Sequence, residues 1–236
     1  MSPVPKGSPK AFVPPAKPVH QVVVGLEQAL WEAGPNPVTD FADALEFEGR
    51  HQMPPDEKKQ WDALGRFRDA LTEFLVGKDA AFIGGVAVRS YGGRRTATVD
   101  FDFLVAPALL KEVTSFLGGQ GGLLKSTVES TYSFHVEPCR LDVDVRLAES
   151  ALDKEALKTA GDSRFKGRKL RIVRPEFLPT MKVKAYSERK GQPEGDQDRK
   201  DVQGLVGVGS TSPEAIREIL KRHRPDLAAE LDEILQ

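Results

Sequence analysis

The spacing of apolar and polar residues changes several times along the chain, and each spacing predicts a different element. Residues 56–76 repeat apolar side chains every three or four positions, which is the pattern of an amphipathic helix packed on a sheet. Alternating or short apolar runs, typical of strands, follow in the middle of the chain. The predicted strands cover residues 80–83, 98–105, 130–137, 140–147 and 169–173.

Helical patterns flank these strands and dominate the last part of the chain. A glycine-rich loop is predicted at 118–122, and a tight turn at Pro138. The fold class that follows is α/β (α+β), with a small mixed β-sheet, flanking helices on one face and a C-terminal helical portion. The predicted helices cover residues 86–91, 107–117, 153–160 and the region from 175 onward, with breaks near 191–195 and 207–212.

Composition divides the chain into four parts. Residues 1–20 hold six prolines and three lysines and lack acidic residues, which predicts a flexible tail. An alternative is a basic arm that touches RNA or a partner. Residues 21–60 form a predicted helical extension that includes a short helix over 21–33. Residues 61–174 contain the predicted sheet core, and residues 175–236 the C-terminal helical portion.

Overall composition is that of a soluble globular protein with an ordinary core. The net charge of -1 provides no general field for nucleic acid, so a polynucleotide would have to bind a local patch. No apolar run approaches the roughly 20 residues of a membrane span, and no secretory signal is apparent, so we expect a cytoplasmic protein without a membrane partner. The single cysteine, Cys139, is expected to pack as a small apolar residue.

Two acidic residues stand two positions apart in the segment TVDFDFLV. Because side chains alternate across a strand, Asp100 and Asp102 point to one face, about 7 Å apart. Two carboxylates so placed repel each other unless water or a cation lies between them. Hard oxygen ligands of this kind suit Mg²⁺. The alternative is a strand with an ordinary water-facing polar side.

The segment RLDVDVRL repeats the pattern and offers a third carboxylate. Asp142 and Asp144 share a face with two arginines, and mutual neutralisation on an exposed face is one explanation. If this strand neighbours 98–105, one of its aspartates completes a three-carboxylate cage. Such a cage can hold two metal ions about 3.5–4 Å apart, which activate an attacking oxygen and neutralise a triphosphate.

A glycine pair lies between a predicted strand and a predicted helix, about fifteen residues before Asp100. Gly84 and Gly85 let the backbone approach a ligand closely, and amides at a helix start attract anions. A simple strand-to-helix turn is the alternative. Guanidinium and hydroxyl groups suited to phosphate follow, although each could equally be a surface or strand position. These further candidates are Arg89, Arg94, Arg95 and Thr98.

The order of these motifs resembles the polymerase-beta-type nucleotidyltransferase superfamily. GGVAVRSYGGRRTATVDFDFLV (84–105) is similar to its signature and is closest to the AbiEii-like branch of abortive-infection and toxin–antitoxin systems. DVRLA is similar to the context of the family's third aspartate, which assigns that role to Asp144, with Asp142 as the runner-up. Many members have Gly-Ser where this chain has Gly84-Gly85, so phosphate binding would depend more on backbone amides here.

The resemblance extends over residues 62–208. VRPEFLPTMKVKAYSER and DQDRKDVQGLV are similar to two later helices of the family. On the first, Lys182 and Arg189 flank an apolar stripe and could reach toward phosphate or simply lie along the surface. On the second, Asp201 falls within an apolar stripe and needs a partner, which could be one of these cations, or it acts at the site. Asp198 is expected to cap the helix.

The resemblance implies a Mg²⁺-dependent nucleotidyltransferase, with Mn²⁺ able to substitute. Asp100 and Asp102 would ligate two metal ions, and Asp144 would ligate one and help to draw the acceptor proton. An NTP would donate the nucleotidyl group to tRNA, a small molecule or a protein hydroxyl. A cognate antitoxin or a second copy of the chain could be a partner. The alternative is a non-catalytic module that binds a nucleotide or a partner protein on the same fold.

Overall fold

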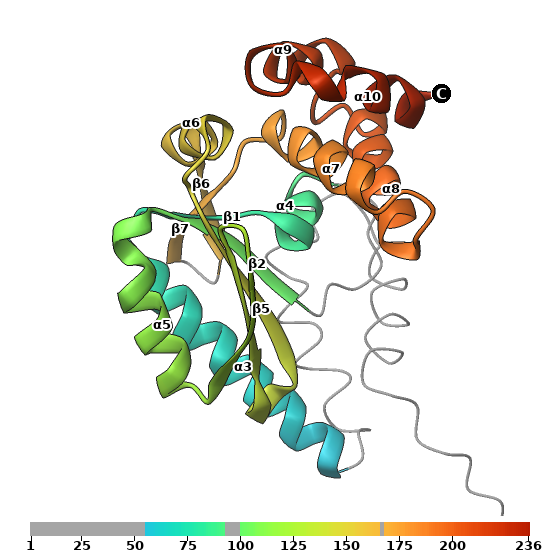
Figure 1. The fold of residues 1–236 in the computed structure, drawn as a ribbon. Coiled ribbons are helices and arrows are strands. Elements are labelled where there is room, and N and C mark those ends of the chain that lie inside the picture. Colours follow the sequence, from blue (N-terminus) through green and yellow to red (C-terminus); the bar gives the residue numbers. More distant parts are fainter. Residues whose placement is uncertain (1–54, 93–99, 166–167) are drawn as a thin grey trace, which may run out of the picture.

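A mixed β-sheet forms the centre of the computed structural model, which describes residues 55–92, 100–165 and 168–236 (Figure 1). The predicted tail and the predicted helix over 21–33 lie outside these residues. The strands of the sheet are β1 (Ala80–Phe82), β2 (Asp100–Val105), β3 (Gly122–Val128), β4 (Thr131–Val136), β5 (Leu141–Leu147), β6 (Gly161–Phe165) and β7 (Arg168–Ile172).

Helices precede, separate and follow the strands. They are α3 (Pro55–Leu75), α4 (Gly84–Ser90), α5 (Leu110–Gly119), α6 (Ala151–Thr159), α7 (Phe177–Glu188), α8 (Pro193–Gly207), α9 (Pro213–His223) and α10 (Ala228–Leu235). Short 3-10 turns occur at Pro107–Leu109, Glu137–Cys139 and Pro225–Leu227. No helix in the described ranges is long and apolar enough to cross a membrane.

The strand order within the described residues is β3-β4-β5-β2-β1-β7-β6. Strand β2 pairs parallel with β5 and antiparallel with β1, whereas β1 pairs parallel with β7. The sheet is therefore mixed and has helices around it, as the sequence predicts. The predicted helix over 56–76 is confirmed, as are the five predicted strands within the described residues. The exposed strand β3 and the edge strand β6 were not predicted, and α5 extends to Gly119, into the predicted glycine-rich loop.

Apolar side chains gather where α3 and α5 cover one face of the sheet. The Phe67 ring on α3 lies 6.3 Å from that of Phe101 on β2, and Phe74 stacks on Phe116 of α5 at 4.3 Å. The edge of Phe82 meets Phe103, which is completely buried. The other face also carries helical cover at one end, because Arg146 on β5 forms an ion pair of 3.0 Å with Asp153 on α6. The helices thus lie on both faces, not on one as predicted.

The C-terminal helices enclose a second group of buried apolar side chains. Helix α7 contributes to both groups, because Leu178 and Met181 join the sheet core while Val183 and Tyr186 join the second group. A helix buried on several sides needs apolar residues on more than one stripe. The other members of the second group are Val202, Ile216, Leu220, Leu227, Leu231 and Ile234.

Truncating Phe103 to alanine should test the sheet core. Because the ring is fully buried between β1 and the helical layer, we expect Phe103→Ala to lower the free energy of unfolding by about 3–5 kcal/mol. Urea denaturation would measure this loss. Val76→Ala, at a position where 45% of the residue is exposed, serves as the control and should change stability by about 0.5 kcal/mol or less.

Candidate active site

Four aspartates share one face of the sheet because β2 and β5 pair in parallel. The register places Asp100 opposite Asp142 and Asp102 opposite Asp144. Neighbouring strands lie about 4.8 Å apart, so each pair brings two carboxylate-bearing residues side by side. The condition for a three-carboxylate site, that these two strands be neighbours, is therefore met. All four aspartates are partly exposed, whereas the alternate residues Phe103, Val143 and Val145 are buried on the opposite face.

The glycine pair lies directly against this acidic face. Strand β1 ends beside β2, where the amide of Ile83 donates a hydrogen bond of 3.0 Å to the carbonyl oxygen of Asp102. Gly84 follows with a φ of +59°, a value that favours glycine. A Cβ at Gly84 would lie only 1.7 Å from Oδ2 of Asp102. The start of α4 and the Asp102 carboxylate therefore touch at a position that excludes any side chain.

The two candidates for the third carboxylate differ in their surroundings. Asp142 accepts a hydrogen bond of 3.1 Å from Nζ of Lys125, and its Oδ1 lies 2.7 Å from Nδ1 of His135. Partial burial would raise the pKa of Asp142, but these hydrogen bonds outweigh it and hold that pKa below its usual value. Asp144, next to Asp102, makes no hydrogen bond or ion pair with any described residue.

The acidic face has the right donor chemistry for a hard divalent cation. Carboxylate oxygens are the ligands that Mg²⁺ prefers, and Asp100, Asp102 and Asp144 bring three of them to one face of two adjacent strands. Among residues 55–92, 100–165 and 168–236, no group of three or more His, Cys, Asp or Glu side chains is placed to hold a metal ion. Side-chain rotations would thus have to gather these carboxylates.

Lys182 lies in a charged cluster between α7 and α8. Its Nζ is 2.7 Å from Oδ1 of Asp198 and 3.1 Å from Oδ2 of Asp201, and both carboxylates are almost completely buried. Arg189 approaches Asp198 at 3.6 Å, and Gln197 donates a hydrogen bond of 2.8 Å to Asp201. Asp201 thus has the cationic partner that its apolar surroundings demand.

The predicted capping role of Asp198 is wrong. Helix α8 begins at Pro193 with Gln192 as the N-cap, so Asp198 lies well inside the helix. Its position one and a half turns along α8 lets its carboxylate reach Lys182 across the helix pair. The sequence shows a cation on the preceding helix, but only the packing of α7 against α8 reveals that Asp198 is buried beside it.

Several predicted phosphate contacts fall beyond what the structure describes. Arg94, Arg95 and Thr98 belong to residues 93–99, outside the described ranges. Arg89 lies in α4, but its side chain is outside the description as well. The assignment of these residues to phosphate remains a prediction.

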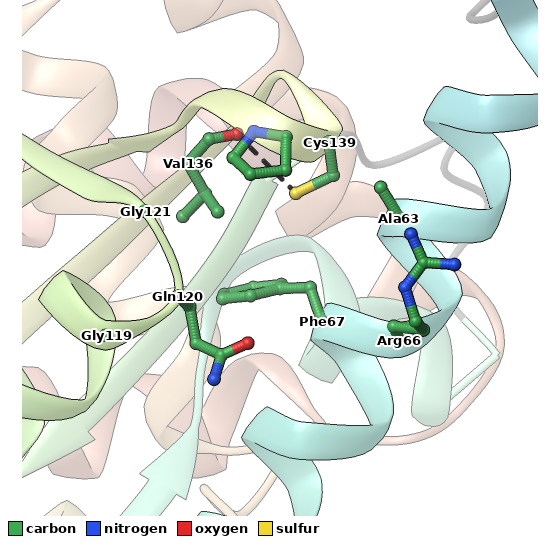
Figure 2. A pocket seen from close by; sticks show the side chains of 9 residues that line it. Ala63, Arg66, Phe67, Gly119, Gln120, Gly121, Val136 and Cys139 are labelled. Carbon is green, nitrogen blue, oxygen red and sulfur yellow. Dashed lines mark hydrogen bonds between the residues drawn. The ribbon is translucent and has the colours of Figure 1, made fainter.

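A cavity of about 320 Å³ lies between α3 and the end of β4 (Figure 2). Phe67 of α3 and Val136 of β4 line it, together with Cys139. Burial raises the pKa of the Cys139 thiol to about 11, and Sγ donates a weak hydrogen bond to the carbonyl oxygen of Val136. A neutral, buried thiol is a poor nucleophile, which agrees with the expected packing role of Cys139.

Alanine at Gly84 tests the contact with Asp102. Because a Cβ there would overlap the carboxylate, we expect Gly84→Ala to displace Asp102 and to lose binding of Mg²⁺–ATP in calorimetry. Gly77→Ala is the matched control, since Gly77 has a φ of +72° but no heavy atom near the added Cβ. Backbone strain should lower the free energy of unfolding of both variants by about 1–2 kcal/mol. Equal nucleotide binding by the two would contradict the proposed importance of this contact.

Methionine at Lys182 tests the buried cluster. Removing the cation leaves Asp198 and Asp201 with too little compensating charge, so Lys182→Met should lower the free energy of unfolding by about 3–5 kcal/mol. Lys184→Met, on the same helix, removes an ion pair with the exposed Glu129 and should cost about 1 kcal/mol or less. Chemical denaturation of both variants would show whether the difference exists.

Sequence comparisons find no matching family model and no significant match among curated proteins. Solved structures do match. The antibiotic-resistance factor ANT(2'')-Ia aligns with a TM-score of 0.52 and 14% identity, over 73% of this chain and 95% of its own. The lincosamide antibiotic adenylyltransferase LnuA gives 0.43 and 14%, over 62% and 96%. A nucleotidyltransferase-like protein from Paracoccidioides brasiliensis gives 0.42 and 18%, over 72% and 88%.

LnuA is named as an adenylyltransferase, and the Paracoccidioides brasiliensis protein as nucleotidyltransferase-like. The TM-score of 0.52 establishes a shared fold with the first match, and 14% identity leaves the substrates of this chain open. Its alignment covers nearly the whole of that protein, so the similarity concerns a complete fold. This chain shares the fold of that antibiotic-resistance factor.

Proposed function

We propose that this chain transfers a nucleotidyl group from an NTP to an acceptor hydroxyl and releases pyrophosphate. The observation that carries this proposal is the contact of Gly84 with Asp102, beside Asp144 on the adjoining strand. A backbone turn that a phosphate can approach closely thereby adjoins two carboxylates. Phosphoryl chemistry depends mainly on positioning and on charge stabilisation, and this arrangement offers both.

Mg²⁺, with Mn²⁺ as a substitute, is the proposed cofactor. Asp100 and Asp102 would hold two ions, and Asp144 would complete the site for one of them. When bound, such ions activate the attacking oxygen and neutralise the triphosphate. Asp144 suits this role better than Asp142, because Asp142 is already engaged by Lys125 and His135.

Bond changes in the proposed reaction are simple to state. The acceptor oxygen forms a bond to the α-phosphorus, and the bond from that phosphorus to the bridging oxygen of the β-phosphate breaks. Pyrophosphate leaves with the electron pair, and the Asp144 carboxylate receives the proton of the acceptor hydroxyl. Attacking and leaving oxygens lie roughly in line across the phosphorus.

Backbone amides of Gly84 and Gly85 are proposed to contact the phosphates. Arg89, Arg94, Arg95 and Thr98 are further proposed contacts, based on the sequence motif. Lys182 would add positive charge, with Asp198 and Asp201 orienting its ammonium group.

Assignment to the AbiEii-like branch is a finer proposal that rests on the motif resemblance. It carries with it a cytoplasmic location, a toxin–antitoxin context with a cognate antitoxin, and tRNA as one acceptor. A small molecule or a protein hydroxyl is the other kind of acceptor to be tested. Homo-oligomerisation is also a proposal.

The reaction can be tested with α-labelled NTPs, Mg²⁺ and a panel of acceptors that includes total tRNA and tobramycin. Asp102→Asn and Asp144→Asn remove one charge each with little change of shape. We expect each to reduce transfer by about 10²-fold or more, as for loss of other charge-stabilising groups at reacting centres. Asp162→Asn, on the exposed edge strand β6, is the control and should retain wild-type transfer.

Nucleotide binding separates the candidate third carboxylates. Calorimetry with Mg²⁺–ATP should show weaker binding for Asp144→Asn and near wild-type binding for Asp142→Asn. The reverse order would transfer the role to Asp142. Binding that Asp102→Asn abolishes, without pyrophosphate release by the wild type, would instead support a non-catalytic nucleotide-binding module. Unchanged turnover in Asp102→Asn would contradict the proposed site.

A further inference from the structure

The acidic face continues beyond β5 onto an open surface formed by β4 and β3. On β4, Ser133 lies opposite Asp144 and His135 lies opposite Asp142. Strand β3 follows as the outer strand, with a register irregularity between Leu124 and Ser126 that contains Lys125. The register places seven residues on the same side as the aspartates. They are Leu123, Lys125, Ser126, Val128, Thr131, Ser133 and His135.

If the proposed function is correct, the direction of nucleotidyl transfer determines the side from which the acceptor reaches the site. Phosphates held at Gly84 lie on the β1 side of Asp102, because β1 leads directly into α4. In-line displacement requires the acceptor to approach from the side opposite the leaving pyrophosphate. Across the sheet, that side is β5 followed by β4 and β3.

His135 is held in a fixed orientation on this side. Its Nδ1 lies 2.7 Å from Oδ1 of Asp142, and Lys125 lies 3.1 Å from the other carboxylate oxygen. A carboxylate that accepts a hydrogen bond from Nδ1–H fixes the ring and leaves Nε2 as an acceptor. Within the described parts of the chain, Nε2 of His135 makes no hydrogen bond.

Lys125 can also donate further hydrogen bonds. An ammonium group has three, and the Lys125 side chain is 52% exposed while one donor engages Asp142. Of the seven residues on this surface, Leu123 and Val128 are apolar, and the others offer hydroxyl, imidazole and ammonium groups. On β5, Asp142 beside His135 is already paired, and Asp144 beside Ser133 lies at the inner margin of this surface. The outer part of the surface, around Lys125, therefore complements oxygen-rich or anionic groups better than a polycation.

We infer that the acceptor approaches over β4 and β3, where His135 accepts a hydrogen bond from an acceptor hydroxyl other than the reacting one and Lys125 donates to a neighbouring oxygen. Asp142 is a positioning residue that orients both side chains. The half of the site around Gly84 and Asp102 then binds the nucleotide, and the outer half binds the acceptor.

Steady-state transfer from labelled NTP, with total tRNA as the anionic probe and tobramycin as the polycationic one, tests the inference. His135→Ala and Lys125→Ala should each raise the KM for the acceptor by about tenfold or more, as for the loss of a charge-assisted hydrogen bond. The KM for the NTP should remain within about twofold. Thr127→Ala is the matched control, because Thr127 is exposed on the opposite face of β3.

A double-mutant cycle tests the positioning role of Asp142. Asp142→Ala should raise the acceptor KM less than His135→Ala does, and the two changes combined should raise it by less than the product of their separate effects. Filter binding of labelled tRNA without NTP provides a readout that is independent of turnover and should show the same order. If His135→Ala fails to fold, Lys125→Ala, on the exposed outer strand, still decides the outcome.

Different results would overturn different conclusions. Transfer by the wild type, with acceptor KM values that neither His135→Ala nor Lys125→Ala alters, would overturn the acceptor surface alone. An effect of Thr127→Ala equal to that of His135→Ala, or preferred use of tobramycin over tRNA, would do the same. A wild type that releases no pyrophosphate with any acceptor would overturn the proposed function and this inference together.

Discussion

Parallel pairing of β2 with β5 is the constraint on which the candidate site depends. Because side chains alternate with a period of two, the pairing of Asp102 with Asp144 commits Phe103 and Val145 to the opposite, buried face. A slip of one residue would bury the aspartates and expose the apolar side chains, at a cost far larger than the repulsion between the carboxylates. The hydrophobic core therefore holds like charges together on its outer side.

The carboxylates of this protein differ in the cationic partners that offset their negative charge. Asp142 is paired on the sheet with Lys125 and His135, and Asp198 and Asp201 are paired between helices with Lys182 and Arg189. Buried carboxylates require such partners because water is not available to them. Asp144 makes no such contact with a described residue, although it lies beside another aspartate. This contrast distinguishes Asp144 from Asp142 as the candidate third carboxylate, which spacing in the sequence does not.

The sequence identifies the helices and strands whose buried apolar residues recur at a regular spacing. The alternation in 98–105 and 140–147 predicted two strands with their aspartates on one face, and the structure contains both strands. Their adjacency could be stated only as a condition, because pairing between segments forty residues apart is decided by the whole sheet. Strand β3 was not predicted, since its exposed side chains give little periodic signal. Asp198 was misassigned because capping and burial look alike in one sequence, whereas the contact with Lys182 is a tertiary feature.

Helix α7 has a consequence for how the molecule unfolds. Leu178 and Met181 pack in the sheet core, while Val183 and Tyr186 pack with the C-terminal helices. Unfolding of either group of apolar side chains would displace α7, which also packs in the other group. The two groups are therefore coupled through one helix, and the C-terminal helices are expected to exchange their amide hydrogens in the same cooperative unit as the strands that carry the aspartates.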